Sequence, residues 1–455
     1  MDQLIAEKLR GDSRVVEAKR LLMEACAAAQ QEIKGIRPAK ASLKASYDEW
    51  IRSAEELRGA PLFHPLIGSG IGRGALVELA DGSHRFDLIS GVGVHFGHSL
   101  PLLLSATIDA ALDDIVMQGN LEQNREAITL MRLLAQHSQL DHCFLSTSGA
   151  MACENALKIA FQANYPRTRL LAFNGCFAGR TLALAQITDT AKYREGLPTP
   201  IFVDYLPFFS HERPEESLLE AMACLKEHLR RYPKQHAALM LELIQGEGGV
   251  YPGARSFFAP LMELCRAEGI LIIADEVQSF GRTDHLFAYQ HFALSELVDI
   301  ATVGKLTQVC ATLFRSKDKP RPGLLSQTFI ASSASLHAAL AILQSLIHDG
   351  YLGSDGKNMR LGALFQARLE ALHRKMPDRI RGPFGIGTMV AFTPYDGSYE
   401  RSVDFANRLF NAGVIGFIAG SHPTRIRFLL PAGGIREEDI DEVAEIIESL
   451  LCEDG

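Results

Sequence analysis

Two apolar runs near the middle of the chain end in polar residues. Residues 270–274 lead directly into Asp275, and residues 298–303 lead into Gly304 and Lys305. Apolar runs of this length with polar boundaries predict strands that are buried on both faces. Because polar groups gather at the carboxyl ends of strands in an open α/β sheet, we expect Asp275 and Lys305 to face one crevice.

Similar runs recur along the chain and alternate with helical patterns. We expect strands near residues 143–145, 169–173 and 237–241, and helices near residues 101–115, 124–137, 257–268 and 335–347. Strands that alternate with helices of this length indicate a mostly parallel sheet. The fold class is therefore predicted as α/β, with a large domain and a smaller α+β domain.

The domain boundaries follow from changes in this pattern. Residues 1–67 predict helices interrupted near Pro38, in a segment expected to serve as a packing or dimer contact. Residues 68–345 form the predicted large domain, whose start is expected to contribute to the small domain. A linker rich in glycine and aspartate then leads into the predicted C-terminal small domain, residues 346–455. Asp81-Gly82 predicts a hairpin turn between two short strands.

Composition narrows the range of partners. The net charge of −8 without a concentrated basic stripe argues against nucleic acid. No apolar run approaches the roughly 18 residues of a membrane span, and the first residues lack a signal-peptide pattern. The eight cysteines are scattered without a C-x-x-C pair, which favours reduced thiols. We therefore expect a cytoplasmic protein that acts on small molecules.

An acid and an amine at neighbouring strand ends suggest a pyridoxal phosphate site. Lys305 would form a Schiff base with the cofactor, and Asp275 would pair with the ring nitrogen. Gln278 could hydrogen-bond the ring oxygen. Each residue also has a simpler interpretation, because Lys305 could be a solvated loop lysine and Asp275 a structural ion pair or helix cap.

Two further segments suggest binding groups. The turn at residues 146–150 lies between a strand and a helix, where free backbone N–H groups favour phosphate, although Ser148 could be a plain N-cap. Phe177 could stack on a flat ring, and Arg180 could bind a carboxylate. The alternatives are a core phenylalanine and a surface arginine. Arg427, on a predicted strand, could likewise be solvated.

Taken together and in order, these segments resemble class III aminotransferases, which are fold-type I pyridoxal phosphate enzymes. The resemblance runs from about Gly68 to the end of the chain. It rests on Asp81-Gly82, Gly97-His98, Ser148-Gly149-Ala150, residues 177–181, residues 245–249, residues 274–278, Gly304-Lys305, Thr328-Phe329 and residues 426–428. Residues 149–158 and 304–310 are most similar to the lysine 6-aminotransferase branch.

The resemblance implies a seven-stranded, mostly parallel sheet and a pyridoxal 5'-phosphate site. Lys305 would hold the cofactor and move protons, and Asp275 would pair with its ring nitrogen. The remaining cofactor contacts would come from Ser148, Gly149 and Ala150 at the phosphate, Phe177 on the ring, Gln278 at the ring hydroxyl, and Thr328 of the partner subunit in a homodimer.

For the substrates, the resemblance implies that Arg427 binds the α-carboxylate of glutamate or 2-oxoglutarate. Glu247 would pair with Arg427 while a terminal amine is bound, and Arg180 would bind a distal carboxylate. The expected reaction moves a terminal amino group to 2-oxoglutarate by ping-pong chemistry. Met151, Ala178 and residues 330–332 depart from the usual family pattern. An epimerase or aminomutase with the same cofactor, or a catalytically silent scaffold protein, remains an alternative.

Overall fold

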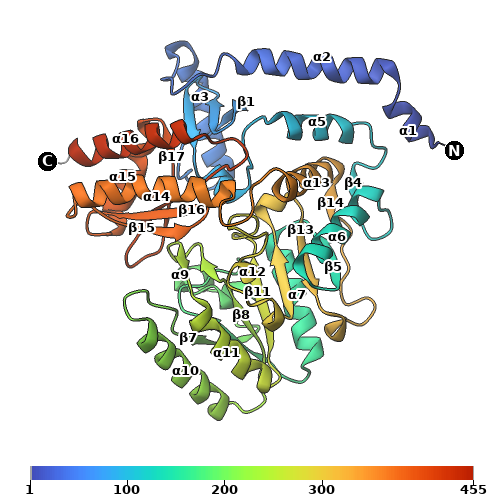
Figure 1. The fold of residues 1–455 in the computed structure, drawn as a ribbon, viewed down its shortest axis with the longest axis vertical. Coiled ribbons are helices and arrows are strands. Elements are labelled where there is room, and N and C mark those ends of the chain that lie inside the picture. The colour runs from blue at the N-terminus through green and yellow to red at the C-terminus, as the bar shows by residue number, and fades with distance from the viewer. Residues whose placement is uncertain (1–2, 454–455) are drawn as a thin grey trace. The chain divides into compact units, whose positions relative to one another are not determined.

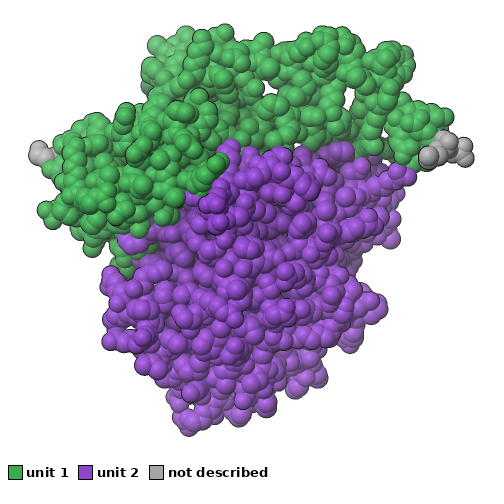
Figure 2. Space-filling model, viewed as in Figure 1, with its two compact units in different colours: residues 1–114, 360–383, 390–455 green, residues 115–359, 384–389 purple. Residues whose placement is uncertain are grey.

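The computed structural model describes residues 3–453, and the chain forms two compact units (Figures 1 and 2). Unit 1 contains residues 1–114, 360–383 and 390–455, and unit 2 contains residues 115–359 and 384–389. The predicted divisions after residues 67 and 345 stay a prediction, as does the expected contribution of the start of the large domain to the small domain. Residues 68–114 belong to unit 1 because β3 (His84–Asp87) pairs with β17 (Val414–Ile415), which comes from the C-terminal part of the chain.

Unit 2 contains a seven-stranded sheet in the order β5-β13-β12-β11-β8-β6-β7. Only β13 runs antiparallel to its neighbours, so the predicted α/β class with a mostly parallel sheet is confirmed. The strands are β5 (His142–Ser146), β6 (Arg169–Phe173), β7 (Phe202–Leu206), β8 (His236–Leu241), β11 (Leu271–Glu276), β12 (Ile300–Val303) and β13 (Cys310–Phe314).

Long helices flank this sheet. They are α6 (Arg125–Ser138), α7 (Gly149–Ala163), α10 (Pro214–Arg231), α11 (Arg255–Ala267) and α13 (Ser333–His348) (Figure 1). Helix α7 packs on β8, β11, β12 and β13 through a face of small and apolar side chains. Shorter elements complete the unit: α8 (Leu184–Ile187), α9 (Ala191–Arg194), α12 (Ala288–His291), and the strand pairs β4 (Met117–Gln118) with β14 (Ala331–Ser332) and β9 (Ile244–Gln245) with β10 (Tyr251–Pro252).

Three of the longer elements of unit 2, namely α10, β7 and β13, were not predicted. Helix α10 buries only Ser217, Ala221 and Leu225 among its 18 residues, so its apolar stripe is narrow. Its ends nevertheless follow helix chemistry, with Pro214 at the start, glutamates in the first turn and basic residues in the last. Strands β7 and β13 are short and were also missed. The helix expected over residues 101–115 is α5 (Pro101–Ala110), which ends five residues earlier.

Unit 1 holds two four-stranded sheets. One is β1 (Gly68–Arg73), β2 (Leu76–Leu79), β3 and β17. The other is β15 (Ile380–Ile386), β16 (Met389–Pro394), β19 (Arg425–Leu429) and β18 (Phe417–Ala419), of which residues 384–386 and Met389 are assigned to unit 2. The predicted hairpin at Asp81-Gly82 joins β2 to β3, and Gly82 adopts φ +75° in the turn. The helices are α1 (Ile5–Arg10), α2 (Ser13–Gln30), α3 (Ala41–Arg58), the short α4 (Ser90–Gly93), α5, α14 (Lys357–Lys375, whose first residues lie in unit 2), α15 (Tyr399–Asn411) and α16 (Glu437–Glu453).

None of the helices within residues 3–453 combines the length and the apolar character that a bilayer crossing requires.

Candidate active site

Asp275 and Lys305 line one cavity in unit 2, as the strand-end pattern predicts. The cavity has a volume of about 320 Å³. Asp275 lies near the end of β11, and Lys305 follows the end of the neighbouring parallel strand β12. The other predicted residues that line the cavity are Gly149, Ala150, Phe177, Arg180 and Gln278. These predicted residues come from four separate segments of unit 2, which thus meet at this cavity.

Asp275 is held by three hydrogen-bond donors. Its Oδ1 accepts from the Val277 N–H and from the Thr302 hydroxyl, both at 3.0 Å. The Cys153 thiol lies 3.4 Å from Oδ2 and donates to it. Burial raises the pKa of Asp275, while these donors and the charge of Lys305 act in the opposite direction. A cation placed against this carboxyl group would relieve the desolvation of its charged form.

Lys305 adopts a backbone conformation that is uncommon for a residue with a side chain. Its φ angle is +54°, and Gln308 three residues later also has a positive φ of +60°. The left-handed conformation of a non-glycine residue carries strain, which folded proteins often retain at functional positions. The turn at Lys305 starts a short 3₁₀ segment that reverses the chain between β12 and the antiparallel β13. The tight reversal therefore accompanies a lysine that lines the cavity.

Two interpretations were given for the turn before α7, a helix N-cap at Ser148 and a phosphate site, and the structure is compatible with both. Ser148 is the N-cap of the helix, and its hydroxyl accepts from the Met151 N–H at 3.2 Å. Gly149 and Ala150, in the first turn, line the cavity, where their position at a helix N-terminus favours an anion. A Cβ atom on Gly149 would lie 2.8 Å from Val277 Cγ1, so this position requires glycine. A role in binding phosphate remains a prediction.

Glu242 also lines the cavity, and the sequence analysis did not select it as a site residue. Its Oε1 accepts from the Phe177 N–H at 2.9 Å, and its Oε2 accepts from the Gly246 N–H at 3.1 Å. Burial, together with the nearby carboxyl group of Asp275, raises the pKa of Glu242 to about 8. One carboxyl group thus joins the loop of Phe177 to the loop of Glu247. The signal in the sequence is the same as for Asp275, because Glu242 follows directly after the apolar residues 237–241.

Cys153 and Thr302 are two further residues that the sequence analysis did not assign to the site. Burial and Asp275 raise the pKa of Cys153 well above its usual range, so the thiol stays protonated and can donate. Thr302 lies opposite Asp275 in the β11–β12 register. Thr302 could be identified as a neighbour of Asp275 only from the register of these two strands.

The predicted substrate residues are distributed over both units. Arg180 lines the cavity, and its guanidinium lies 4.0 Å from the centre of the Tyr193 ring. Glu247 is half-buried, close enough to Glu242 to contribute to the raised pKa of Glu242. Arg427 belongs to unit 1, where it is fully buried on β19 with its guanidinium 5.5 Å from the centre of the Phe417 ring. Thr328 is exposed in the loop before β14.

The donor set of the cavity fits pyridoxal phosphate. A flat cationic ring, an aldehyde and a phosphate require an acid, an amine and an anion site. Asp275 supplies a buried acid, Lys305 supplies the amine, and the N-terminus of α7 supplies N–H groups toward an anion. The sheet topology and this donor set together define a fold-type I pyridoxal phosphate enzyme.

Residues 65–451 match the family model described as aminotransferase class-III, so the chain belongs to this family and depends on pyridoxal phosphate. The family resemblance found in the sequence is therefore confirmed, as is the expectation of an aminotransferase.

Sequence relatives are named for several related amine substrates. The acetylornithine aminotransferase of Archaeoglobus fulgidus is 29% identical over 384 residues, which cover 83% of this chain and 93% of that protein. The [LysW]-aminoadipate semialdehyde transaminase of Deinococcus radiodurans is 30% identical over 388 residues, covering 84% and 85% of the two chains. Among solved structures, lysine aminotransferase from M. tuberculosis has a TM-score of 0.79 at 24% identity, covering 89% of this chain and all of that one. At this identity, the structural likeness supports the fold alone.

Proposed function

We propose that this enzyme moves a terminal amino group of an amino acid or diamine to 2-oxoglutarate by ping-pong chemistry. The observation that carries the proposal is the shared cavity of Lys305 and Asp275 in a class III aminotransferase. In a ping-pong reaction, the donor would give up its amino group and leave as an aldehyde or oxo acid before the 2-oxo acid binds at the same site and receives the group.

The residues of the cavity divide this work. When bound, pyridoxal phosphate supplies an electron sink for the bonds at the carbon that carries the amino group. The Nζ atom of Lys305 would hold the cofactor aldehyde and would move the proton of the donor carbon. Asp275 would hold the positive charge of the cofactor ring, and Phe177 and Gln278 would complete its binding site.

The choice of substrates is proposed to rest on three charged residues. Arg427 binds the α-carboxylate of 2-oxoglutarate bidentately, and Glu247 pairs with Arg427 while a terminal amine is bound. Arg180, at the cavity, binds a more distant carboxylate of the donor. The names of relatives support this class of donor, since they specify acetylornithine and a semialdehyde of LysW-aminoadipate.

We further propose a homodimer in which Thr328 of the partner subunit completes the phosphate site. Exposed apolar side chains support a contact with a second chain. Phe329 beside Thr328 is 54% exposed, and Val16 and Leu22 on α2 are 57% and 52% exposed. All eight cysteines are free thiols, which supports a reducing, cytoplasmic location.

A donor panel tests the reaction and the substrate class together. Lysine, ornithine, N-acetylornithine, 4-aminobutyrate and diamines are each incubated with 2-oxoglutarate, and glutamate is measured. We expect glutamate from at least one donor with a terminal amine, and from none of them with the Lys305→Ala variant. Glutamate formation from α-amines alone would contradict the proposed class of donor.

The alternative of an epimerase or aminomutase is separated by omitting the 2-oxo acid. A transferase stops after one equivalent of donor per site, whereas an epimerase or aminomutase continues to turn over. Continued turnover with the donor alone would overturn the transfer reaction while leaving the pyridoxal phosphate site intact.

A further inference from the structure

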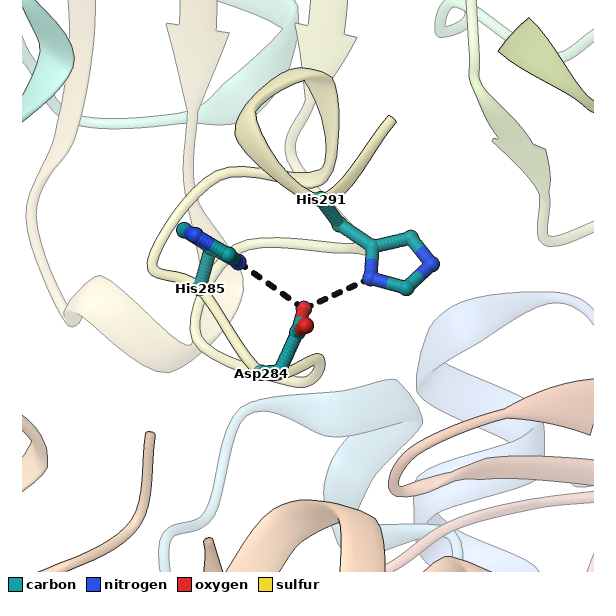
Figure 3. Close-up of side chains that lie close together, drawn as sticks. All are labelled: Asp284, His285 and His291. Atoms are coloured by element: carbon teal, nitrogen blue, oxygen red, sulfur yellow. Dashed lines mark hydrogen bonds and ion pairs between the residues drawn. The ribbon is translucent and has the colours of Figure 1, made fainter. Parts of the chain in front are cut away.

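Two imidazoles converge on one carboxylate oxygen in the loop that follows the cofactor strand β11. The Nδ1 atom of His285 lies 2.9 Å from Asp284 Oδ1, and the Nδ1 atom of His291 lies 2.6 Å from the same oxygen. Figure 3 shows the carboxylate between the two rings, each of which turns its Nδ1 atom toward it. The three ligand-type atoms all lie within 4.8 Å of one another.

The backbone of this loop is held in place before any ligand binds. The Gly281 N–H donates to the Leu286 carbonyl at 2.7 Å and closes the turn. The buried Asn358 side chain donates to the carbonyls of Gly281 and Thr283, at 2.9 and 3.0 Å. The Asp284 carbonyl itself accepts from the Gly353 N–H at 2.7 Å. Since the backbone positions are already fixed, binding a ligand here requires adjustment of side chains only.

We propose that Asp284, His285 and His291 form a binding site for Zn²⁺ or a chemically similar divalent transition metal. Two imidazole nitrogens and one carboxylate oxygen match the ligand preference of zinc, copper and nickel rather than that of magnesium or calcium. The His285 side chain is 49% exposed, so a metal and a water in the fourth position have access from solvent. This site lies outside the donor set assigned to pyridoxal phosphate.

The geometry requires a small expansion. Tetrahedral zinc with bonds of about 2.0–2.1 Å places neighbouring ligand atoms about 3.3 Å apart. The imidazole nitrogens of His291 and His285 lie 2.6 and 2.9 Å from the carboxylate oxygen, so they must move outward by roughly 0.7 and 0.4 Å. Each neutral imidazole then carries its proton on Nε2 and offers its Nδ1 lone pair, so binding changes the tautomer but requires no redox step. The half-exposed His285 ring has room for this movement.

Metal titration of the tag-free holoenzyme, stripped with a chelator, tests the proposal. Zn²⁺ binding is measured by calorimetry, and Co²⁺ serves as a visible probe of the ligand type. We expect one tight site per chain, whose Co²⁺ spectrum lacks the intense near-ultraviolet band of thiolate ligands. His285→Gln keeps a hydrogen-bond donor beside Asp284 but removes the metal ligand, and should weaken binding at least tenfold. Asp284→Asn should do the same.

The control is His211→Ala, which removes another exposed histidine and should leave the affinity unchanged. Thermal unfolding without metal shows whether each variant is folded, and the half-exposed position of His285 makes its glutamine variant the main comparison. If the wild-type protein binds Zn²⁺ no more tightly than His285→Gln, the three side chains form hydrogen bonds only and the proposal is wrong. A thiolate band that persists in the variant would place the metal on cysteine and would also overturn the proposal.

Discussion

Replacing Glu242 with glutamine is expected to change how the stability of the cofactor-free enzyme depends on pH. Burial raises the pKa of Glu242 from its ordinary value of 4.5 to about 8 in the folded protein. Between these two values, the unfolded chain has lost the proton while the folded chain still holds it. Stability from this group is therefore fully present below about pH 4.5 and is lost progressively as the pH rises toward 8. Glutamine cannot ionise, so the Glu242→Gln variant does not lose this stability as the pH rises.

The size of the effect follows from the same two values. One pKa unit corresponds to about 1.36 kcal/mol, so the rise to about 8 corresponds to roughly 5 kcal/mol, most of it between pH 5 and pH 8. The glutamine side chain retains one oxygen for the N–H groups of Phe177 and Gly246 but leaves the other without an acceptor, which costs about 1–3 kcal/mol at every pH. The stability of the variant therefore contains a cost that is the same at every pH and a gain that grows with pH, and measurements at two pH values separate them.

Urea unfolding followed by circular dichroism at pH 5 and pH 8 measures both terms. We expect the stability of Glu242→Gln relative to wild type to improve by several kcal/mol from pH 5 to pH 8. Glu215→Gln, at an exposed glutamate of α10, is the control and should show no such change. If the difference between Glu242→Gln and wild type is the same at both pH values, the inference that Glu242 is neutral in the folded state is refuted.

Three substitutions test the site more directly. Lys305→Ala should abolish transamination. Cofactor absorbance after gel filtration should show that the variant still binds the cofactor without a covalent bond. Residual turnover near the wild-type rate would exclude Lys305 as the reactive amine. Asp275→Asn should lower turnover roughly 100- to 5,000-fold, since losing one partner of a buried ion pair costs about 3–5 kcal/mol; steady-state kinetics measure this, and a loss under tenfold would contradict the role. Gly246→Ala places a Cβ 1.9 Å from Gln278 Oε1, so the Gln278 side chain must move. A cofactor titration should then show binding weakened by about 1–3 kcal/mol. An unchanged dissociation constant would show that Gln278 makes no important cofactor contact.

The pairing of Asp275 with Lys305 could be predicted because both follow long apolar strands. Buried strands leave a clear pattern, and the rule that chemistry lies at their carboxyl ends needs no further geometry. Strand β13 was missed although all of its residues are buried, because Cys310 follows Lys305 by only five residues and no turn signal separates them. The antiparallel reversal depends instead on the left-handed conformations of Lys305 and Gln308, which are unusual for these residue types.

Contacts across the sheet could not be predicted from spacing along the chain. Thr302 donates to Asp275 because the β11–β12 register places them side by side, and a shift of one residue would put Val303 there instead. Cys153 lies on the buried face of α7, but its contact with Asp275 depends on how that helix packs on the strands. Glu242 had a sequence signal, yet its two backbone partners come from different loops.

The consecutive acids Asp275 and Glu276 show how the direction of side chains on a strand decides which acid faces the cavity. Successive side chains on a strand point to opposite faces, so only one of two adjacent carboxyl groups can face the cavity. Asp275 lines the cavity, whereas Glu276 accepts from the Ser279 hydroxyl and from the Tyr289 N–H of α12. Burial raises the pKa of Glu276 to about 7, so an acid with a strongly perturbed pKa lies next to Asp275 without lining the cavity. A perturbed pKa identifies buried acids, and the direction of the side chain decides which of them can meet the cofactor.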